Sequence, residues 1–176
     1  MKKTISIHYQ EITDFQLLSD LDKKLIDRAI DAMKHSYSSY SNFSVGAALI
    51  LENNQIIIGS NQENASFPCG ICAERVALFS ASTNFPNLLM KKIAITAKSK
   101  NFEIKGPVGP CGLCRQVLLE YEEKQNINIE ILLFNNKKII KLASAKDLLP
   151  LFFQENKLKN QENKLKNQEN KLKNNL

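Results

Sequence analysis

The chain has 176 residues, 43% of them hydrophobic, which is enough for one folded domain with a core. Its net charge is +6, but residues 154–176 hold six Lys and three Glu, which leaves a mildly basic body with a net charge of +3. This balance argues against nucleic-acid binding driven by charge. We find neither a signal-peptide pattern nor an apolar run of about 20 residues, so we expect a cytoplasmic protein without a membrane span.

The spacing of apolar residues predicts alternating helices and strands. An amphipathic helix is expected over 20–36, where apolar residues recur every three or four positions: Leu21, Leu25, Ile26, Ala29, Ile30 and Met33. Runs rich in β-branched residues at 45–51 and 56–59 predict a hairpin. The remaining predicted elements are helices over 73–81, 112–123 and 144–149, and strands over 92–97, 127–134 and 139–142. This alternation favours an α/β layered domain with one central sheet.

The end of the chain has a different composition. The heptapeptide Gln-Glu-Asn-Lys-Leu-Lys-Asn occurs three times, at 154–160, 161–167 and 168–174. Each copy carries one leucine, whereas a coiled coil needs two apolar positions in each heptad. We therefore expect a folded domain over 1–153 and a low-complexity tail over 154–176. The tail is interpreted as a solvated, partly disordered extension, with a weak self-associating helix as the alternative.

Three of the four cysteines stand in a pattern typical of a catalytic metal site. Residues 72–75 read Cys-Ala-Glu-Arg, and residues 110–114 read Pro-Cys-Gly-Leu-Cys. A ligand, one residue, a glutamate and a later Pro-Cys-x-x-Cys form the signature of zinc-dependent deaminases, in which three cysteines can serve as ligands. The pattern predicts one zinc per chain, held by Cys72, Cys111 and Cys114, with a fourth coordination position left open.

Two neighbours of Cys72 are expected to serve that site, and a third leaves an alternative open. Glu74 is the predicted acid and base, which would carry protons while a zinc-bound hydroxide attacks the substrate. Arg75 is expected to donate to the thiolate sulfurs and to offset their charge. Cys69 lies three residues before Cys72, so the four cysteines together also fit a closed, structural zinc site.

A second group of polar residues follows the predicted hairpin. Asn61 and Glu63 are two positions apart, so on an extended strand their side chains share one face. An amide and a carboxylate side by side suit a sugar hydroxyl, which donates to one and accepts from the other. Polar residues are also common at strand ends, so this pair alone does not establish a binding site.

These segments together resemble the small homotetrameric cytidine deaminases. The resemblance covers about residues 20–153 and rests on 72–75, 110–116, 61–66 and the Phe-Ser-Val-Gly-Ala-Ala segment at 43–48. It implies a three-layer α/β/α sandwich with a central mixed sheet. It also implies zinc-dependent hydrolytic deamination of cytidine and deoxycytidine to uridine, deoxyuridine and ammonia, in pyrimidine salvage.

The same resemblance assigns substrate contacts. It implies that Phe43 lies against the pyrimidine, that Asn61 and Glu63 bind the ribose 3′-hydroxyl, and that the backbone near Ala73 reads the base edge. The segment at 148–153 resembles the terminal segment of the family, in which a phenylalanine, here Phe153, reaches into the site of a neighbouring subunit. A homotetramer with shared sites is therefore expected.

Three other functions are compatible with parts of the pattern. A blasticidin-type deaminase has the same architecture, but Arg75 directly after Glu74 and the Asn61/Glu63 pair favour a simple nucleoside. A nucleic-acid editing deaminase would need basic and aromatic residues along a strand-binding groove, which the short body does not show. A zinc-stabilised module without activity would have no use for Glu74.

Overall fold

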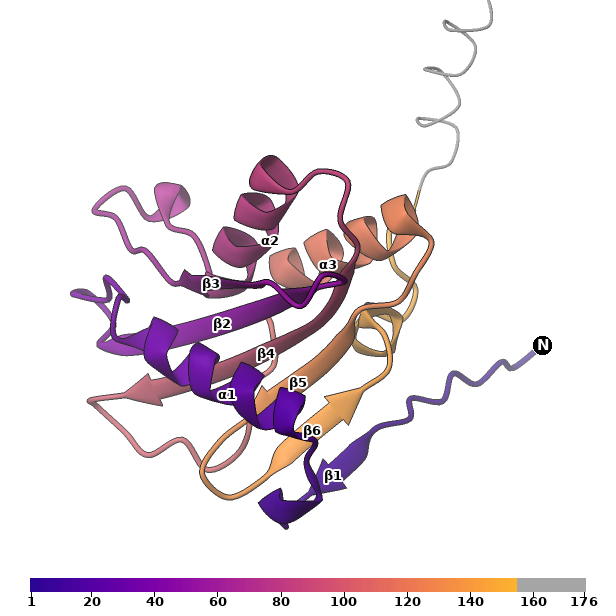
Figure 1. Ribbon diagram of the computed structural model, residues 1–176, viewed down its shortest axis with the longest axis horizontal. Coiled ribbons are helices and arrows are strands. Elements are labelled where there is room, and N and C mark those ends of the chain that lie inside the picture. The colour runs from indigo at the N-terminus through magenta and orange to yellow at the C-terminus, as the bar shows by residue number, and fades with distance from the viewer. Residues whose placement is uncertain (155–176) are drawn as a thin grey trace, which may run out of the picture.

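The structure is a computed structural model that describes residues 1–154 (Figure 1). The repeated tail predicted over 154–176 lies, apart from Gln154, outside the described residues. One six-stranded sheet organises the chain in the order β1-β6-β5-β4-β2-β3. Its strands are β1 (Gln10–Ile12), β2 (Phe43–Leu51), β3 (Ile56–Ser60), β4 (Met90–Ser99), β5 (Glu130–Phe134) and β6 (Ile139–Leu142).

The sheet is mixed, as expected for the three-layer sandwich. Strands β2 and β3 form the predicted hairpin, and β2 also pairs antiparallel with β4. Strands β4 and β5 run parallel, because α3 (Gly112–Gln125) connects them. Helix α1 (Asp20–Met33) covers one face of the sheet, whereas α2 (Ala73–Asn84) and α3 cover the other (Figure 1). The predicted α/β/α layering is confirmed.

Helix α1 begins as its sequence dictates. The Ser19 side chain caps the helix by accepting a hydrogen bond from the backbone N–H of Asp22. Leu25 and Ala29 are buried against the sheet, as the periodicity predicts. Gly46 on β2 permits this close packing, because a Cβ there would lie 2.0 Å from the Ala29 carbonyl oxygen.

One part of the predicted apolar face of α1 is wrong. Leu21 is 40% exposed, whereas its neighbour Asp22 is only 3% exposed. Asp22 accepts a hydrogen bond from Lys92, and Lys141 lies 3.8 Å from its other carboxylate oxygen. Glu130 completes this charged group by pairing with both lysines. A buried carboxylate is tolerated here because it is paired.

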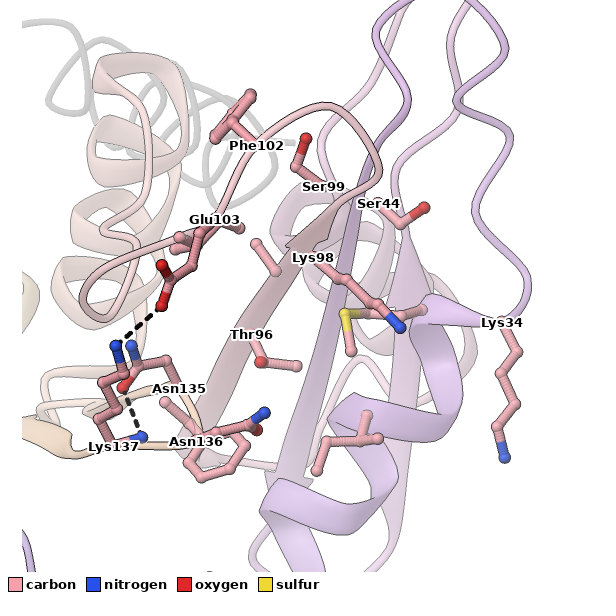
Figure 2. A pocket seen from close by; sticks show the side chains of 15 residues that line it. Lys34, Ser44, Thr96, Lys98, Ser99, Phe102, Glu103, Asn135, Asn136 and Lys137 are labelled. Atoms are coloured by element: carbon pink, nitrogen blue, oxygen red, sulfur yellow. Dashed lines mark hydrogen bonds and ion pairs between the residues drawn. The ribbon is translucent and has the colours of Figure 1, made fainter.

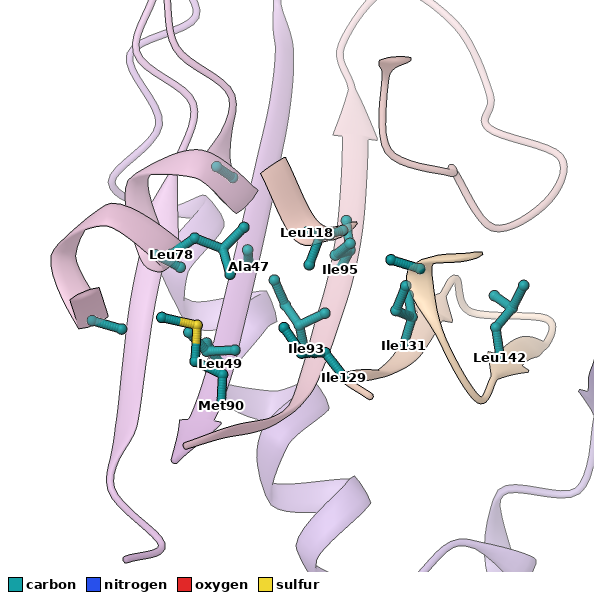
Figure 3. Packing of buried hydrophobic residues seen from close by; sticks show 14 of the residues in the cluster. Ala47, Leu49, Leu78, Met90, Ile93, Ile95, Leu118, Ile129, Ile131 and Leu142 are labelled. Carbon is teal, nitrogen blue, oxygen red and sulfur yellow. The ribbon is translucent and has the colours of Figure 1, made fainter. Parts of the chain in front are cut away.

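The main core lies between the sheet and helices α2 and α3 (Figure 3). Alternation along β4 places Ile93 and Ile95 in this core and Ala94 against α1. Leu78 of α2 and Leu118 of α3 are fully buried on the same side. Burying one such side chain contributes about 1.5–3 kcal/mol. This packing fixes both helices on one face of the sheet, and their N-termini carry the cysteine motif.

Most predicted elements are present with shifted ends, one differs in kind and one strand was not predicted. The strand expected from 127 begins at Glu130, because α3 continues to Gln125 and Asn126 ends it in the left-handed conformation, with φ of 54°. The short helix expected over 144–149 is a 3-10 helix, Ala145–Leu148. Strand β1 was not predicted; it pairs with β6 at the sheet edge.

Gly59 at the end of β3 sets how closely α2 approaches the sheet. A Cβ at this position would lie 2.2 Å from the carbonyl oxygen of Ala73 and 2.7 Å from the backbone nitrogen of Ala77. Both atoms belong to the first turns of α2, which Cys72 precedes as the N-cap residue. The absence of a side chain at Gly59 therefore positions the first cysteine of the motif.

We predict that Gly59→Ala displaces the start of α2, because backbone atoms cannot yield as a flexible side chain can. The expected cost is about 1–3 kcal/mol of unfolding free energy, typical of overpacking, together with loss of zinc from Cys72. Thermal unfolding and zinc content per chain would measure both effects. Gly106→Ala is the control, since a Cβ there meets no atom within 4 Å. Equal stability and zinc content in the two variants would contradict the prediction.

Candidate active site

The three predicted ligands lie at the N-termini of two helices on the same face of the sheet. Cys72 is the N-cap of α2, Cys111 is the N-cap of α3, and Cys114 lies in the first turn of α3. The unpaired N–H groups and partial positive charge of a helix N-terminus favour thiolate over thiol. The fold thus brings together Cys72 and Cys111, which are 39 positions apart in the sequence.

The sulfur positions fit a tetrahedral zinc. The Sγ atoms of Cys72 and Cys111 are 3.8 Å apart, and those of Cys111 and Cys114 are 3.5 Å apart. All three lie within 4.8 Å of one another. Zinc–sulfur bonds of about 2.3 Å at tetrahedral angles place two sulfurs about 3.8 Å apart. The cluster therefore fits one zinc ion per chain and leaves a fourth position open.

Cys69 lies outside this cluster. Among residues 1–154, the only group of three or more potential Cys, His, Asp or Glu ligands is Cys72, Cys111 and Cys114. Cys69 ends a short 3-10 helix, Phe67–Cys69, and is exposed. The geometry supports the open three-cysteine site and gives no support to the closed four-cysteine alternative.

The thiols interact strongly with one another. Hydrogen bonding with Cys114, and then with Cys111 and Arg75, lowers the pKa of Cys72 to about 5 against the opposing effect of burial. The same hydrogen bond with Cys72, together with burial and the charge of Glu74, raises the pKa of Cys114. Three thiolates this close require positive charge nearby, and a divalent cation supplies it.

Glu74 lies beside the ligands in the first turn of α2. It is 4% exposed and is the one charged residue among the buried residues of α2. Burial raises the pKa of its carboxyl, the negative charge of Cys72 adds to this, and a hydrogen bond with the Cys114 side chain opposes it. The predicted acid and base thus contacts the metal-ligand cluster, away from bulk water.

Arg75 also faces the cysteines. Burial disfavours its charged form, but hydrogen bonds with Cys72 and Cys114 and the negative charge on both raise the pKa of its guanidinium. Its buried Nε has no hydrogen-bond partner among the described residues. The guanidinium thus places a positive charge beside two of the three clustered sulfurs.

Asn61 and Glu63 share one face of the chain, as predicted. Both side chains contact the 36–45 segment, whereas Gln62 between them donates to the carbonyl oxygen of His35 and to the Ser60 hydroxyl. Asn61 Oδ1 accepts from the Ser36 hydroxyl at 2.6 Å and from the Val45 N–H at 2.8 Å. Its Nδ2 donates to the carbonyl oxygen of Phe43.

Glu63 holds the same segment further along. Its Oε2 accepts from the backbone N–H of Tyr40 at 2.8 Å, and its Oε1 accepts from the Ser41 hydroxyl at 2.5 Å. The hydrogen bond from Ser41 is the main cause that lowers the pKa of Glu63. Sequence reasoning assigned this pair to the substrate alone and missed that it also shapes the 36–45 loop.

Phe43 begins β2 and stacks on Phe102, with 6.0 Å between ring centroids and 22° between ring planes. Sequence reasoning missed Phe102, which is 59% exposed in the loop after β4. Ala73 is fully buried at the start of α2. Phe153 stands apart from these residues: its side chain is 71% exposed, and its carbonyl oxygen accepts from Gln116 Nε2.

Two hollows flank these elements. One, of about 400 Å³, is lined by Tyr40, Ser41, Glu63, Asn64, Phe67 and Gly70. Another, of about 620 Å³, lies between α1 and the Ser99 end of β4, and Figure 2 shows Glu103 and Lys137 paired on one side of it. None of the three clustered cysteines lines either hollow. The smaller hollow is therefore lined by Glu63 of the predicted sugar-binding pair, whereas the larger one is lined by no predicted site residue and reaches Phe43 only through its stacking partner Phe102.

Within residues 1–154, no helix has both the length and the apolar character needed to cross a membrane. Residues 19–129 match the family model described as the cytidine and deoxycytidylate deaminase zinc-binding region. A cytidine deaminase of Sporosarcina psychrophila is 37% identical over 136 residues, which cover 77% of this chain and 93% of that protein. A blasticidin-S deaminase of Bacillus cereus is more distant, at 26% identity over 141 residues, which cover 79% of this chain and 96% of that protein.

Comparison of the fold with solved structures finds the same family. The crystal structure of cytidine deaminase from Burkholderia pseudomallei superposes with a TM-score of 0.64 at 38% identity, and the match covers 74% of this chain and 98% of that chain. The match to the zinc-binding region spans all three clustered cysteines and Glu74. This chain therefore belongs to the cytidine and deoxycytidylate deaminase family.

Proposed function

We propose that this protein removes the amino group of cytidine and deoxycytidine by hydrolysis in the cytoplasm, within the salvage of pyrimidine nucleosides. Water is consumed, and the products are uridine or deoxyuridine and ammonia. The observation that carries the proposal is the cluster of three cysteine sulfurs with the buried carboxylate of Glu74 against it. The relatives named as cytidine deaminases support the choice of a nucleoside.

The chain's own residues account for the proton transfers. Zinc at the three thiolates would act as a Lewis acid that activates water near neutral pH. The Glu74 carboxylate accepts a proton from that water and delivers it to the ring nitrogen next to the carbon under attack. Glu74 then takes the second proton of that water from the hydroxyl now on the ring carbon and gives it to the amino group, which leaves as ammonia while the carbonyl forms. One carboxylate serves both steps because it acts first as base and then as acid.

The remaining residues orient the substrate in this proposal. Phe43 packs against the pyrimidine, and the backbone at Ala73 reads the edge of the base. Asn61 and Glu63 receive the ribose 3′-hydroxyl, and the hollow beside Glu63 leaves room for a sugar. Both the ribo- and the deoxyribonucleoside carry this hydroxyl, so both are proposed as substrates.

We predict that Glu74→Ala abolishes nearly all turnover, by at least about 10²–10⁴-fold, because general acid–base catalysis contributes this much. The ultraviolet absorbance of cytidine follows the reaction, and metal analysis should show zinc retained. Glu103→Gln is the matched control, since Glu103 is an exposed carboxylate that pairs with Lys137. Turnover by the Glu74 variant at the control rate would refute the mechanism. A wild-type protein with one zinc but no activity on cytidine would point to blasticidin-like substrates.

We also propose that Arg75 tunes the metal site electrostatically. Arg75→Gln is predicted to lower kcat far more than it lowers the midpoint of thermal unfolding, because it removes the positive charge beside Cys72 and Cys114. Arg28→Gln, on the exposed side of α1, is the control. If Arg75→Gln changed stability and kcat in proportion, its role would be structural only.

We propose a homotetramer in which Phe153 enters a neighbour's site. Leu151 and Phe153 are 90% and 71% exposed in the isolated chain, so both side chains are accessible to a neighbouring subunit. Truncation after Phe153 is predicted to leave assembly and turnover intact, whereas Phe153→Ala should raise KM. Sedimentation velocity and steady-state kinetics measure these effects. A monomeric active protein, or an unchanged KM in Phe153→Ala, would contradict the proposal.

A further inference from the structure

Helix α3 does more than supply two metal ligands: its side chains also hold the C-terminal segment, residues 144–154. Glu122 accepts hydrogen bonds from the Ser144 hydroxyl and the Ala145 N–H. Gln116 Nε2 donates to the carbonyl oxygen of Phe153. Glu123 pairs with Lys146 at 2.8 Å and accepts from Gln154. Residues 144–154 are thus hydrogen-bonded along α3, the helix whose N-cap is the ligand Cys111.

Arg115 differs from these residues because it bonds both to the C-terminal segment and to the residue that precedes a metal ligand. Its Nε donates to the carbonyl oxygen of Pro110 at 2.7 Å, and its Nη1 donates to the carbonyl oxygen of Leu148 at 2.8 Å. Pro110 immediately precedes the ligand Cys111. A Cβ built on Gly109 would lie 3.6 Å from Arg115 Nη2, so the guanidinium also lies close to the start of this turn. We call residues 109–111 the zinc loop.

The placement of Arg115 is electrostatically unfavourable unless these bonds are made. It is the fourth residue of α3, near the positive end of the helix dipole, where a cation is disfavoured. A guanidinium holds its donors in a rigid planar fork, so the two carbonyl groups must be at fixed relative positions to be bonded at once. Pro110 is buried, which limits the access of water to its carbonyl group as a substitute partner.

We propose that Arg115 is a positioning residue that couples metal binding at the zinc loop to order in the C-terminal segment. A zinc at Cys111 and Cys114 fixes the zinc loop, the fixed Pro110 carbonyl group orients the guanidinium, and the guanidinium holds Leu148. Coupling between two sites is reciprocal in binding free energy, so the ordered segment must also strengthen zinc binding, and we expect this as slower zinc release. The further consequence, that zinc occupancy governs the presentation of Phe153 to a neighbour, rests on the proposed function.

Hydrogen exchange and zinc release test the coupling without any substrate. In the wild type, zinc removal by a chelator should raise amide exchange in 148–153 more than in β2, which serves as the internal reference. Arg115→Gln should raise exchange in 148–153 with zinc bound and make it insensitive to zinc. The variant should also bind zinc at least about fivefold more weakly, the lower end of typical coupling factors, and release it faster than the wild type.

The controls separate coupling from simple fastening. Gln116→Met and Lys146→Gln each remove one contact to the segment without touching the zinc loop, so they should loosen the segment and leave zinc release at the wild-type rate. Arg115→Lys keeps the charge but lacks the planar fork, and it should behave like Arg115→Gln. It is the variant to use if Arg115→Gln does not fold.

Two outcomes would overturn the proposal. One is zinc release at the wild-type rate in both Arg115 variants. The other is amide exchange in residues 148–153 of the wild type that does not change when zinc is removed. Because activity is not measured, failure here leaves the proposed deamination untouched.

Discussion

Three cysteine sulfurs within 4.8 Å of one another are the constraint around which this molecule is arranged. Thiolates repel one another, so bringing them together costs free energy that only positive charge can offset. The chain directs three sources of positive charge at them: the N-terminus of α2, the N-terminus of α3 and the Arg75 guanidinium. A divalent metal completes the balance. Without the two helices on the same face of the sheet, the cysteines would be unrelated residues far apart in sequence.

The packing that brings the three cysteines together depends on a few positions where only glycine fits. Gly59 lets α2 lie against β3, and Gly46 lets α1 lie against the other face of the same hairpin. The two helices therefore pack closely on opposite faces of the sheet, at adjacent strands. Helix α3 is fixed differently, through side chains such as Glu122, whose carboxylate also accepts from the Ile129 N–H at the start of the next strand segment. One ligand-bearing helix is thus held by close packing and the other also by hydrogen bonds.

The sequence predicted the elements and the metal ligands because both depend on local pattern. A short apolar run reveals a strand such as β4, and the spacing of Cys111 and Cys114 is one helical turn. Asp22 was not predicted to be buried, because its partners Lys92 and Lys141 lie far along the chain. Phe102 and Arg115 were missed for the same reason: their contacts join segments that only the fold brings together. The short β1 has too few residues for a periodic pattern.

Glu63 has a consequence for how a sugar would be recognised. Its carboxylate already accepts three hydrogen bonds, from the Ser41 hydroxyl and two backbone N–H groups, so it is not an unpaired charge. A ribose hydroxyl that reaches this carboxylate would have to replace or share the place of the serine hydroxyl. Exchanging one hydroxyl donor for another is nearly neutral in free energy. Recognition at this point would then select for a hydroxyl of the right position while adding little to affinity, which favours release of the product.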